Sequence, residues 1–116
     1  MISKTFLLVC LFSSLAYSQT LPPSNPETIA KGKTVFKTNC AVCHGDNGAG
    51  DGPASSSLNP KPRNFVTGKF KKGDSVKDIF NTVTKGLDGT AMASFSSLPE
   101  ADRGAVAVYI ASLRKK

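Results

Sequence analysis

Two cysteines and a histidine occupy five consecutive positions within the stretch Asn39–Pro53, NCAVCHGDNGAGDGP. A Cys-x-x-Cys pair is typical of four kinds of chemistry: a structural disulfide, a redox-active dithiol, half of a zinc site, or the attachment point of a covalently bound haem. Each kind needs a different compartment and different companion residues. The rest of the chain therefore decides among them.

The N-terminal stretch MISKTFLLVCLFSSLAYSQT has the composition of an export signal. A single positive charge at Lys4 precedes an apolar run over residues 6–16, and residues 16–18, Ala-Tyr-Ser, have the small-x-small pattern that signal peptidase recognises. We therefore predict that residues 1–18 are a signal peptide that is removed. Residues 19–116 are then expected to form a single domain in the periplasm or another exported compartment.

The length of this apolar run also bears on membrane attachment. A transmembrane helix needs roughly 20 apolar residues, and the run over residues 6–16 is shorter than that. We expect no stable membrane insertion once the signal is removed, and a protein that is a monomer or a subunit of a complex. Two alternatives stay open. They are a retained N-terminal anchor and a lipid attached at Cys10, although the Leu-Leu-Val before Cys10 matches lipoprotein processing poorly.

Removal of the signal leaves few residues that bind metals. Cys10 leaves with it, so the remaining chain has Cys40 and Cys43, the single histidine His44 and the single methionine Met92. A structural zinc site takes four Cys or His ligands, which is more than the chain then contains. A thioredoxin-like dithiol belongs to alternating strands and helices, and no strand is predicted. A plain disulfide remains the alternative, but His44 completes the Cys-x-x-Cys-His pattern of c-type haem attachment.

Three segments have the sequence pattern of helices, with apolar residues spaced for one helix face and capping residues at their ends. The stretches between them are rich in Gly, Pro, Ser and Asn and are predicted to be loops. We therefore predict an all-α fold of three to four helices joined by long loops. The signals are Asn25-Pro26 before a helix over 27–39, an N-cap at Asp74 or Ser75 and a stop at Gly86 for a second helix, and Pro99 for a helix that reaches Leu113.

Met92 is the candidate for a second iron ligand. Iron bound by one histidine has a further position, which another His or a Met thioether takes in many haem proteins. Met92 lies in the predicted loop GLDGTAMASF, residues 86–95, without an apolar helical stripe around it. A methionine that fills a gap in the core is the alternative, but such a residue normally belongs to an apolar stripe. We therefore favour His44 and Met92 as a pair of axial ligands.

Over nearly all of residues 19–116, the chain resembles the class I, small monohaem cytochromes c. The resemblance lies in a first helix with Gly32 and Phe36 that runs into CAVCHG, the loop GDGPASSSLNPKPRNF, the segment VTKGLDGTAMASF and a last helix with Tyr109. It implies a cytochrome c fold wrapped around one covalently attached haem c. It also implies that the first and last helices cross closely, with Gly32 and Tyr109 at the contact.

The resemblance implies roles for particular residues. Cys40 and Cys43 would form the thioether bonds to haem, and His44 and Met92 would bind its iron. In this family a proline carbonyl accepts a hydrogen bond from the haem-binding histidine, and Pro53, Pro60 and Pro62 are the candidates here.

The implied function is electron transfer rather than enzymatic catalysis. Two alternatives stay open: a haem protein with an open sixth site that binds gases or catalyses a reaction, and a dedicated cytochrome subunit of a larger oxidoreductase complex. Both alternatives share Cys40, Cys43 and His44 with the electron carrier. Met92 separates the electron carrier from the open-site protein.

Basic residues cluster in the middle of the chain, whose formal net charge is +7. One interpretation is a solvated face that keeps a small protein soluble. The other is a basic rim that steers docking to redox partners with acidic surfaces. The sequence has no nucleic-acid-binding motif, so we expect no nucleic-acid partner. The cluster comprises Lys61, Arg63, Lys69, Lys71, Lys72 and Lys77.

Overall fold

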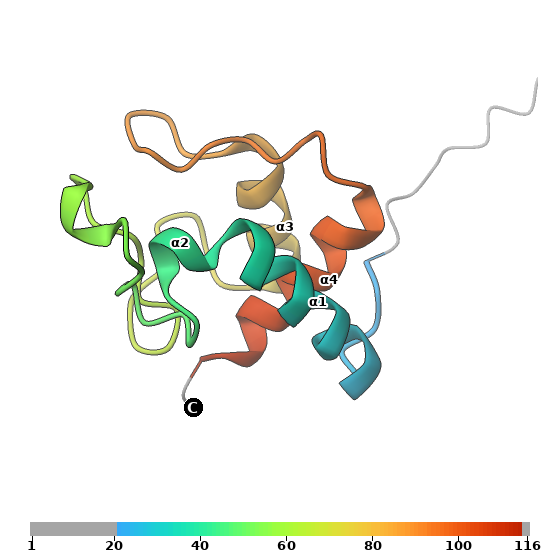
Figure 1. The fold of residues 1–116 in the computed structure, drawn as a ribbon. Helices are drawn as coiled ribbons and strands as arrows, with labels where there is room; N and C mark the ends of the chain where they lie inside the picture. Colours follow the sequence, from blue (N-terminus) through green and yellow to red (C-terminus); the bar gives the residue numbers. More distant parts are fainter. Residues whose placement is uncertain (1–20, 115–116) are drawn as a thin grey trace, which may run out of the picture.

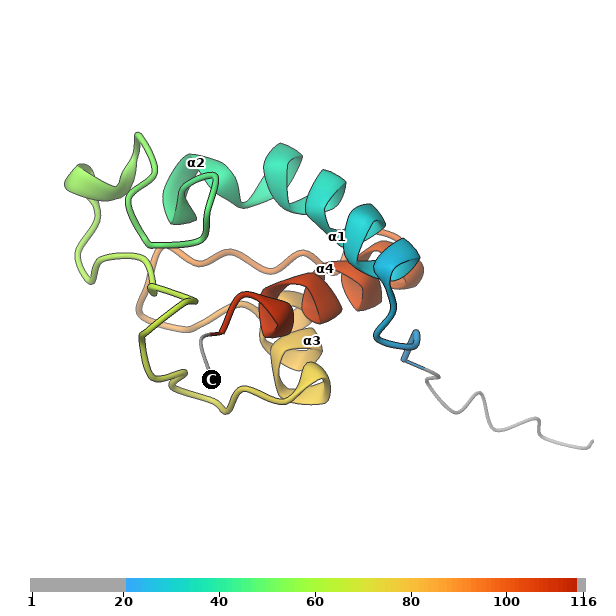
Figure 2. The same cartoon turned by 90° about the horizontal axis from the view of Figure 1, so that it is seen from below.

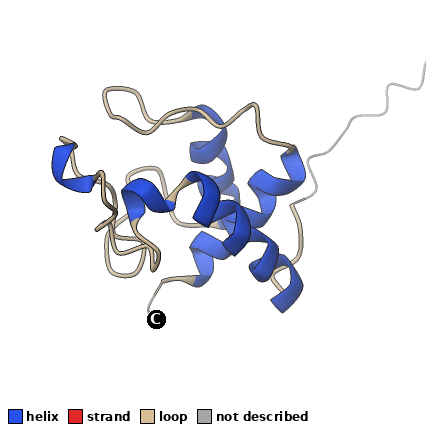
Figure 3. Cartoon of the chain, in the orientation of Figure 1, coloured by secondary structure: helices blue, strands red, loops and turns tan. Residues whose placement is uncertain are grey.

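The computed structural model describes residues 21–114, and every regular element in that range is helical (Figures 1 and 3). The predicted all-α fold is therefore confirmed. The predicted signal peptide, residues 1–18, and Cys10 lie outside the described residues, so both remain predictions. The elements are α1 (Pro26–Asn39), α2 (Ala41–His44), the 3-10 helix η1 (Ser55–Ser57), α3 (Val76–Lys85) and α4 (Glu100–Ser112).

Side-chain caps set where the helices begin and end. Asn25 Oδ1 accepts a hydrogen bond from the Thr28 N–H at 2.9 Å, so α1 begins where the sequence predicts. Of the two candidate caps of α3, Ser75 is the one used, because its Oγ accepts from the Asp78 N–H at 3.0 Å. Gly86 ends α3 with a φ of +73°, a conformation that glycine adopts without strain.

Helices α1 and α4 cross at close range (Figures 1 and 2). A Cβ atom at Gly32 would overlap the Ala105 carbonyl oxygen and would lie 2.7 Å from Tyr109 Cβ, so only glycine fits this contact. The Phe36 and Tyr109 rings pack edge to face beside it, with centroids 5.2 Å apart. The predicted crossing at Gly32 and Tyr109 is confirmed.

Helix α3 packs against α4 and completes a small core. This core buries Phe36, Phe80 and Val106 almost completely. The two long connections, between α2 and α3 and between α3 and α4, both extend toward the side of the molecule where α2 lies (Figures 1 and 2). Residues of both connections line a cavity beside the Cys-x-x-Cys-His motif. Within residues 21–114, no helix has the length and apolar character needed to span a membrane.

Candidate haem site

The Cys-x-x-Cys-His motif forms one helical turn at the end of α1. Cys40 ends α1 and starts α2, and the His44 N–H donates to the Cys40 carbonyl at 2.9 Å. Residues three and four apart on a helix lie on the same face. Cys40, Cys43 and His44 are therefore presented together. Both cysteines carry free thiols in this structure.

All four predicted site residues line one cavity of about 610 Å³: Cys40, Cys43, His44 and Met92. Its volume lies within the roughly 300–1,000 Å³ that is typical of small-molecule and cofactor sites. Cys43 and His44 come from α2 and Cys40 from the junction of α1 and α2, whereas Met92 comes from the connection between α3 and α4. Much of the remaining wall is apolar and includes Leu58, Phe65, Phe70, Ile79, Val83, Phe95 and Ile110.

The His44 ring is held on two sides. Its Nδ1 lies 3.1 Å from the main-chain carbonyl oxygen of Arg63. Because a carbonyl oxygen only accepts, this hydrogen bond places the proton on Nδ1 and leaves Nε2 with a free lone pair, as a metal-binding imidazole requires. The Phe65 ring stacks on the imidazole with centroids 4.2 Å apart. Burial lowers the pKa of His44, although the hydrogen bond to Arg63 opposes this, so the neutral form is favoured.

The acceptor of this hydrogen bond corrects the sequence-based expectation. The carbonyl belongs to Arg63 and not to any of the predicted candidates Pro53, Pro60 and Pro62. Pro62 precedes Arg63 directly, and its ring fixes the backbone φ next to the acceptor. The interaction was predicted correctly, but the residue was wrong, because spacing in an irregular loop does not reveal which carbonyl faces the ring.

The electrostatics of the thiols argue against a redox-active dithiol. Burial, and to a smaller extent the charge of nearby Cys43, together raise the pKa of the Cys40 thiol to about 11. Thiols that exchange disulfides or act as nucleophiles have lowered pKa values, because the thiolate is the reactive form. Cys40 therefore stays protonated at neutral pH.

Met92 lies in a loop that is held by its own hydrogen bonds, and not in the core. The Met92 N–H donates to Thr90 Oγ1 at 3.1 Å, and the Met92 carbonyl accepts from the Leu87 N–H at 3.1 Å. Both main-chain groups of Met92 are thus satisfied within the turn. Met92 is half-buried, and it belongs neither to the buried core nor to the apolar side chains packed on it. The alternative of a core-filling methionine is therefore not supported.

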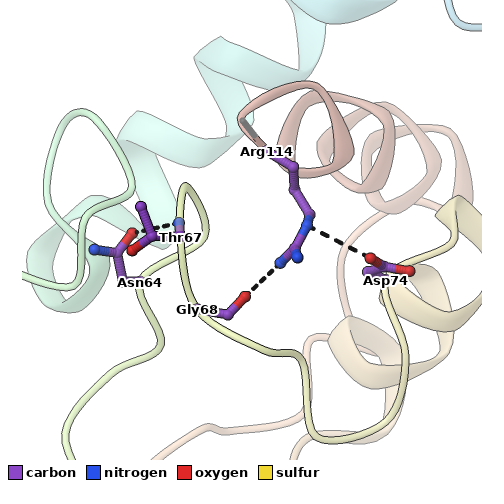
Figure 4. Close-up of polar contacts among 5 residues, drawn as sticks. All are labelled: Asn64, Thr67, Gly68, Asp74 and Arg114. Carbon is purple, nitrogen blue, oxygen red and sulfur yellow. Dashed lines mark hydrogen bonds and ion pairs between the residues drawn. The ribbon is translucent and has the colours of Figure 1, made fainter. Parts of the chain in front are cut away.

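The segment of residues 63–74, which forms another wall of the cavity, is anchored to the end of α4 (Figure 4). The Asn64 side chain accepts from the Thr67 N–H at 3.2 Å and shapes the turn. Arg114 donates to the Gly68 carbonyl and pairs with Asp74 at 3.5 Å. Sequence reasoning missed Arg114, because nothing local to an arginine at the end of a helix signals a contact 46 positions away.

Part of the predicted basic cluster lies at this cavity. Lys61, Arg63, Lys71 and Lys72 line it and are exposed to solvent, so they lie at its rim. The other two members, Lys69 and Lys77, do not line it.

Comparisons with known proteins agree with this architecture. Residues 29–114 match the family described as Cytochrome c. Over 83 residues the chain is 35% identical to the Cbb3-type cytochrome c oxidase subunit CcoP of Azospirillum brasilense. That alignment covers 72% of this chain and 28% of the relative. Over 99 residues it is 31% identical to the thiosulfate dehydrogenase of Stutzerimonas stutzeri. That alignment covers 84% of this chain and 31% of the relative.

A solved structure is also similar. The chain aligns with the reducing HAO-like protein complex of Kuenenia stuttgartiensis with a TM-score of 0.64 and 30% identity, over 84% of this chain and 44% of that one. The chain thus spans about 30% of the length of these two sequence relatives and less than half of the structural one. With a family match over most of its length, the chain belongs to the cytochrome c family, whose members carry haem c and transfer electrons.

Proposed function

We propose that this chain carries electrons through one covalently attached haem c. Cys40 and Cys43 would form the thioether bonds, and His44 and Met92 would bind the iron. The observation that carries this proposal is the cavity of about 610 Å³ that all four side chains line. Met92 joins this set although it is remote from the motif in sequence and plays no part in the apolar core.

The residues present fit this group. Two free thiols lie three positions apart, and the imidazole beside them has its Nδ1 engaged and its Nε2 available. When bound, haem supplies one-electron oxidation and reduction at its iron. The chain supplies attachment, two uncharged donor atoms and apolar walls that exclude water. Ligation by Met and His favours a higher potential than ligation by two histidines.

The rim of the cavity supports a docking role. Lys61, Arg63, Lys71 and Lys72 line it and place positive charge at its rim. Such a patch raises the rate at which an acidic partner meets the protein in a productive orientation, and salt weakens the effect because exposed charges are screened within about 10 Å at 0.1 M ionic strength. We propose that redox partners with acidic surfaces dock at this rim.

The relatives favour a role in electron transfer to or from a larger oxidoreductase. One is a subunit of a cytochrome c oxidase, and the structural neighbour is a protein complex. We propose that this chain passes electrons to or from such an enzyme, as its dedicated cytochrome or as an exchanging partner, in an exported compartment. In either arrangement the chain does not itself catalyse the substrate reaction.

Covalent attachment is the first test of the proposal. Haem should stay with the polypeptide after acid-acetone extraction and on a denaturing gel, because thioether bonds survive unfolding. Cys40→Ala and Cys43→Ala should each lower the yield of haem-stained protein in a host that matures c-type cytochromes. Haem that is extracted completely from the unfolded wild-type chain would contradict covalent attachment.

A further inference from the structure

The residues that follow Met92 are hydrogen-bonded to the last turn of α3. Ser94 Oγ donates to the Thr84 carbonyl at 2.6 Å, and the Phe95 N–H donates to the Val83 carbonyl at 2.9 Å. The last four carbonyls of a helix have no partner within it. The methionine loop therefore satisfies two carbonyls that α3 leaves unpaired, and its position is tied to the end of that helix.

Arg103 of α4 joins these same elements. Its Nη1 donates to Thr84 Oγ1 at 2.8 Å and its Nε donates to the Leu98 carbonyl at 3.1 Å. Its guanidinium also lies over the Phe80 ring, 5.3 Å from the centroid. One side chain thus contacts both the helix that anchors the loop and the far end of the loop. The planar guanidinium donates in two fixed directions, which a lysine ammonium does not reproduce.

The geometry points to Arg103 as a positioning residue for Met92, acting through Thr84 and Ser94. Arg103, Thr84 and Ser94 do not line the cavity. Met92, Ala93 and Phe95 do. A change at Arg103 therefore removes no group that lines the cavity, and it acts there through the loop and the end of α3 that hold Met92. This inference rests on the proposed function, in which the Met92 thioether binds the haem iron.

Loosening the loop should make the sixth position easier for an external ligand to take. Imidazole is a suitable probe, because it competes with the thioether at ferric iron. We expect Arg103→Lys and Ser94→Ala each to raise the apparent affinity for imidazole about tenfold. That factor corresponds to about 1.4 kcal/mol, which is comparable to one hydrogen bond in a folded protein. We also expect faster amide hydrogen exchange at Phe95.

Two controls separate positioning from general destabilisation. Ser96→Ala removes a hydroxyl two positions after Ser94. The Ser96 group that contacts Ser94 is its main-chain N–H, which alanine keeps, so imidazole affinity should be unchanged. Asn25→Ala removes the cap of α1 and weakens the fold at a distance from the loop. It should lower global stability without changing imidazole affinity.

A double-mutant cycle tests the proposed route. Thr84→Val removes the hydroxyl that accepts from Arg103 while keeping the shape of the side chain. If Arg103 acts through Thr84, the double variant Arg103→Lys/Thr84→Val should bind imidazole no more tightly than the tighter-binding single variant. Additive effects of the two changes would overturn this route.

Met92→Ala distinguishes failure of the inference from failure of the proposed function. If Met92→Ala binds imidazole tightly while Arg103→Lys and Ser94→Ala behave as wild type, the positioning role is wrong and Met92 is still the ligand. If Met92→Ala binds imidazole no better than wild type, both the ligand assignment and the positioning role are wrong. If Arg103→Lys does not accumulate with haem, the imidazole affinities of Ser94→Ala and Ser96→Ala are compared instead. Equal affinities would overturn the positioning role of the loop contacts.

Discussion

Substitution of Gly32 by alanine should destabilise the protein, although alanine is the better helix former. The change gains about 1 kcal/mol of helix propensity. The added Cβ, however, would overlap the Ala105 carbonyl and lie 2.7 Å from the Ala105 carbonyl carbon and Tyr109 Cβ. These are backbone atoms and the first atom of a side chain, so α1 and α4 must move apart. Overpacking of this kind costs about 1–3 kcal/mol and occasionally more. The overlap with backbone atoms places the cost at the upper end, about 3 kcal/mol, so after the gain in helix propensity we expect a net loss of about 2 kcal/mol.

Gly104→Ala is the matched control. This glycine also lies inside a helix, but a Cβ there meets only the Pro22 ring, at 2.7 Å from Cδ. Pro22 lies in the irregular segment before α1 and can be displaced more easily than a packed helix. We expect Gly104→Ala to be neutral or to stabilise by up to about 1 kcal/mol.

Urea unfolding of the haem-loaded variants measures both effects. With a slope of about 2 kcal/mol/M, which is within the usual range for small proteins, Gly32→Ala should lower the midpoint by about 1 M. Gly104→Ala should leave it unchanged or raise it. Equal midpoints for the two variants would refute the close crossing of α1 and α4 as the reason for glycine at position 32.

Two further predictions concern docking and helix capping. Lys71→Glu combined with Lys72→Glu should lower the rate of electron transfer to an acidic partner at low salt, measured by stopped flow, with little change in reduction potential. A rate that is insensitive to both the charge changes and salt would show that the rim only solubilises the protein. Ser75→Ala should destabilise the protein by about 1 kcal/mol in urea unfolding, because it removes the cap of α3; unchanged stability would mean that another group replaces the cap.

The parts of the structure that were predicted from the sequence depend on local signals. The caps at Asn25 and Ser75 and the glycine at position 86 set helix ends through contacts a few residues away. The Cys-x-x-Cys-His motif is likewise local, because one helical turn is enough to bring its three side chains together.

The parts that were not predicted depend on contacts between distant segments. The hydrogen bond from His44 to Arg63 and the one from Arg103 to Thr84 each span nineteen positions. Arg63 lies in an irregular loop, which has no periodicity to read, whereas Arg103 and Thr84 lie on two helices whose packing against each other no local pattern reveals. The family resemblance supplied the kind of partner for His44, but only the folded chain identifies the carbonyl.

The most direct test of the account is carbon monoxide binding to the ferrous protein, compared between wild type and Met92→Ala. We predict that wild type binds carbon monoxide poorly, because the Met92 thioether fills the sixth position. Met92→Ala should keep its covalently attached haem, bind carbon monoxide readily and have a lower reduction potential, because a neutral sulfur donor favours ferrous iron. Rapid binding by wild type, with no change of spectrum or potential in Met92→Ala, would contradict the assignment of Met92 as a ligand and would favour a haem protein with an open site.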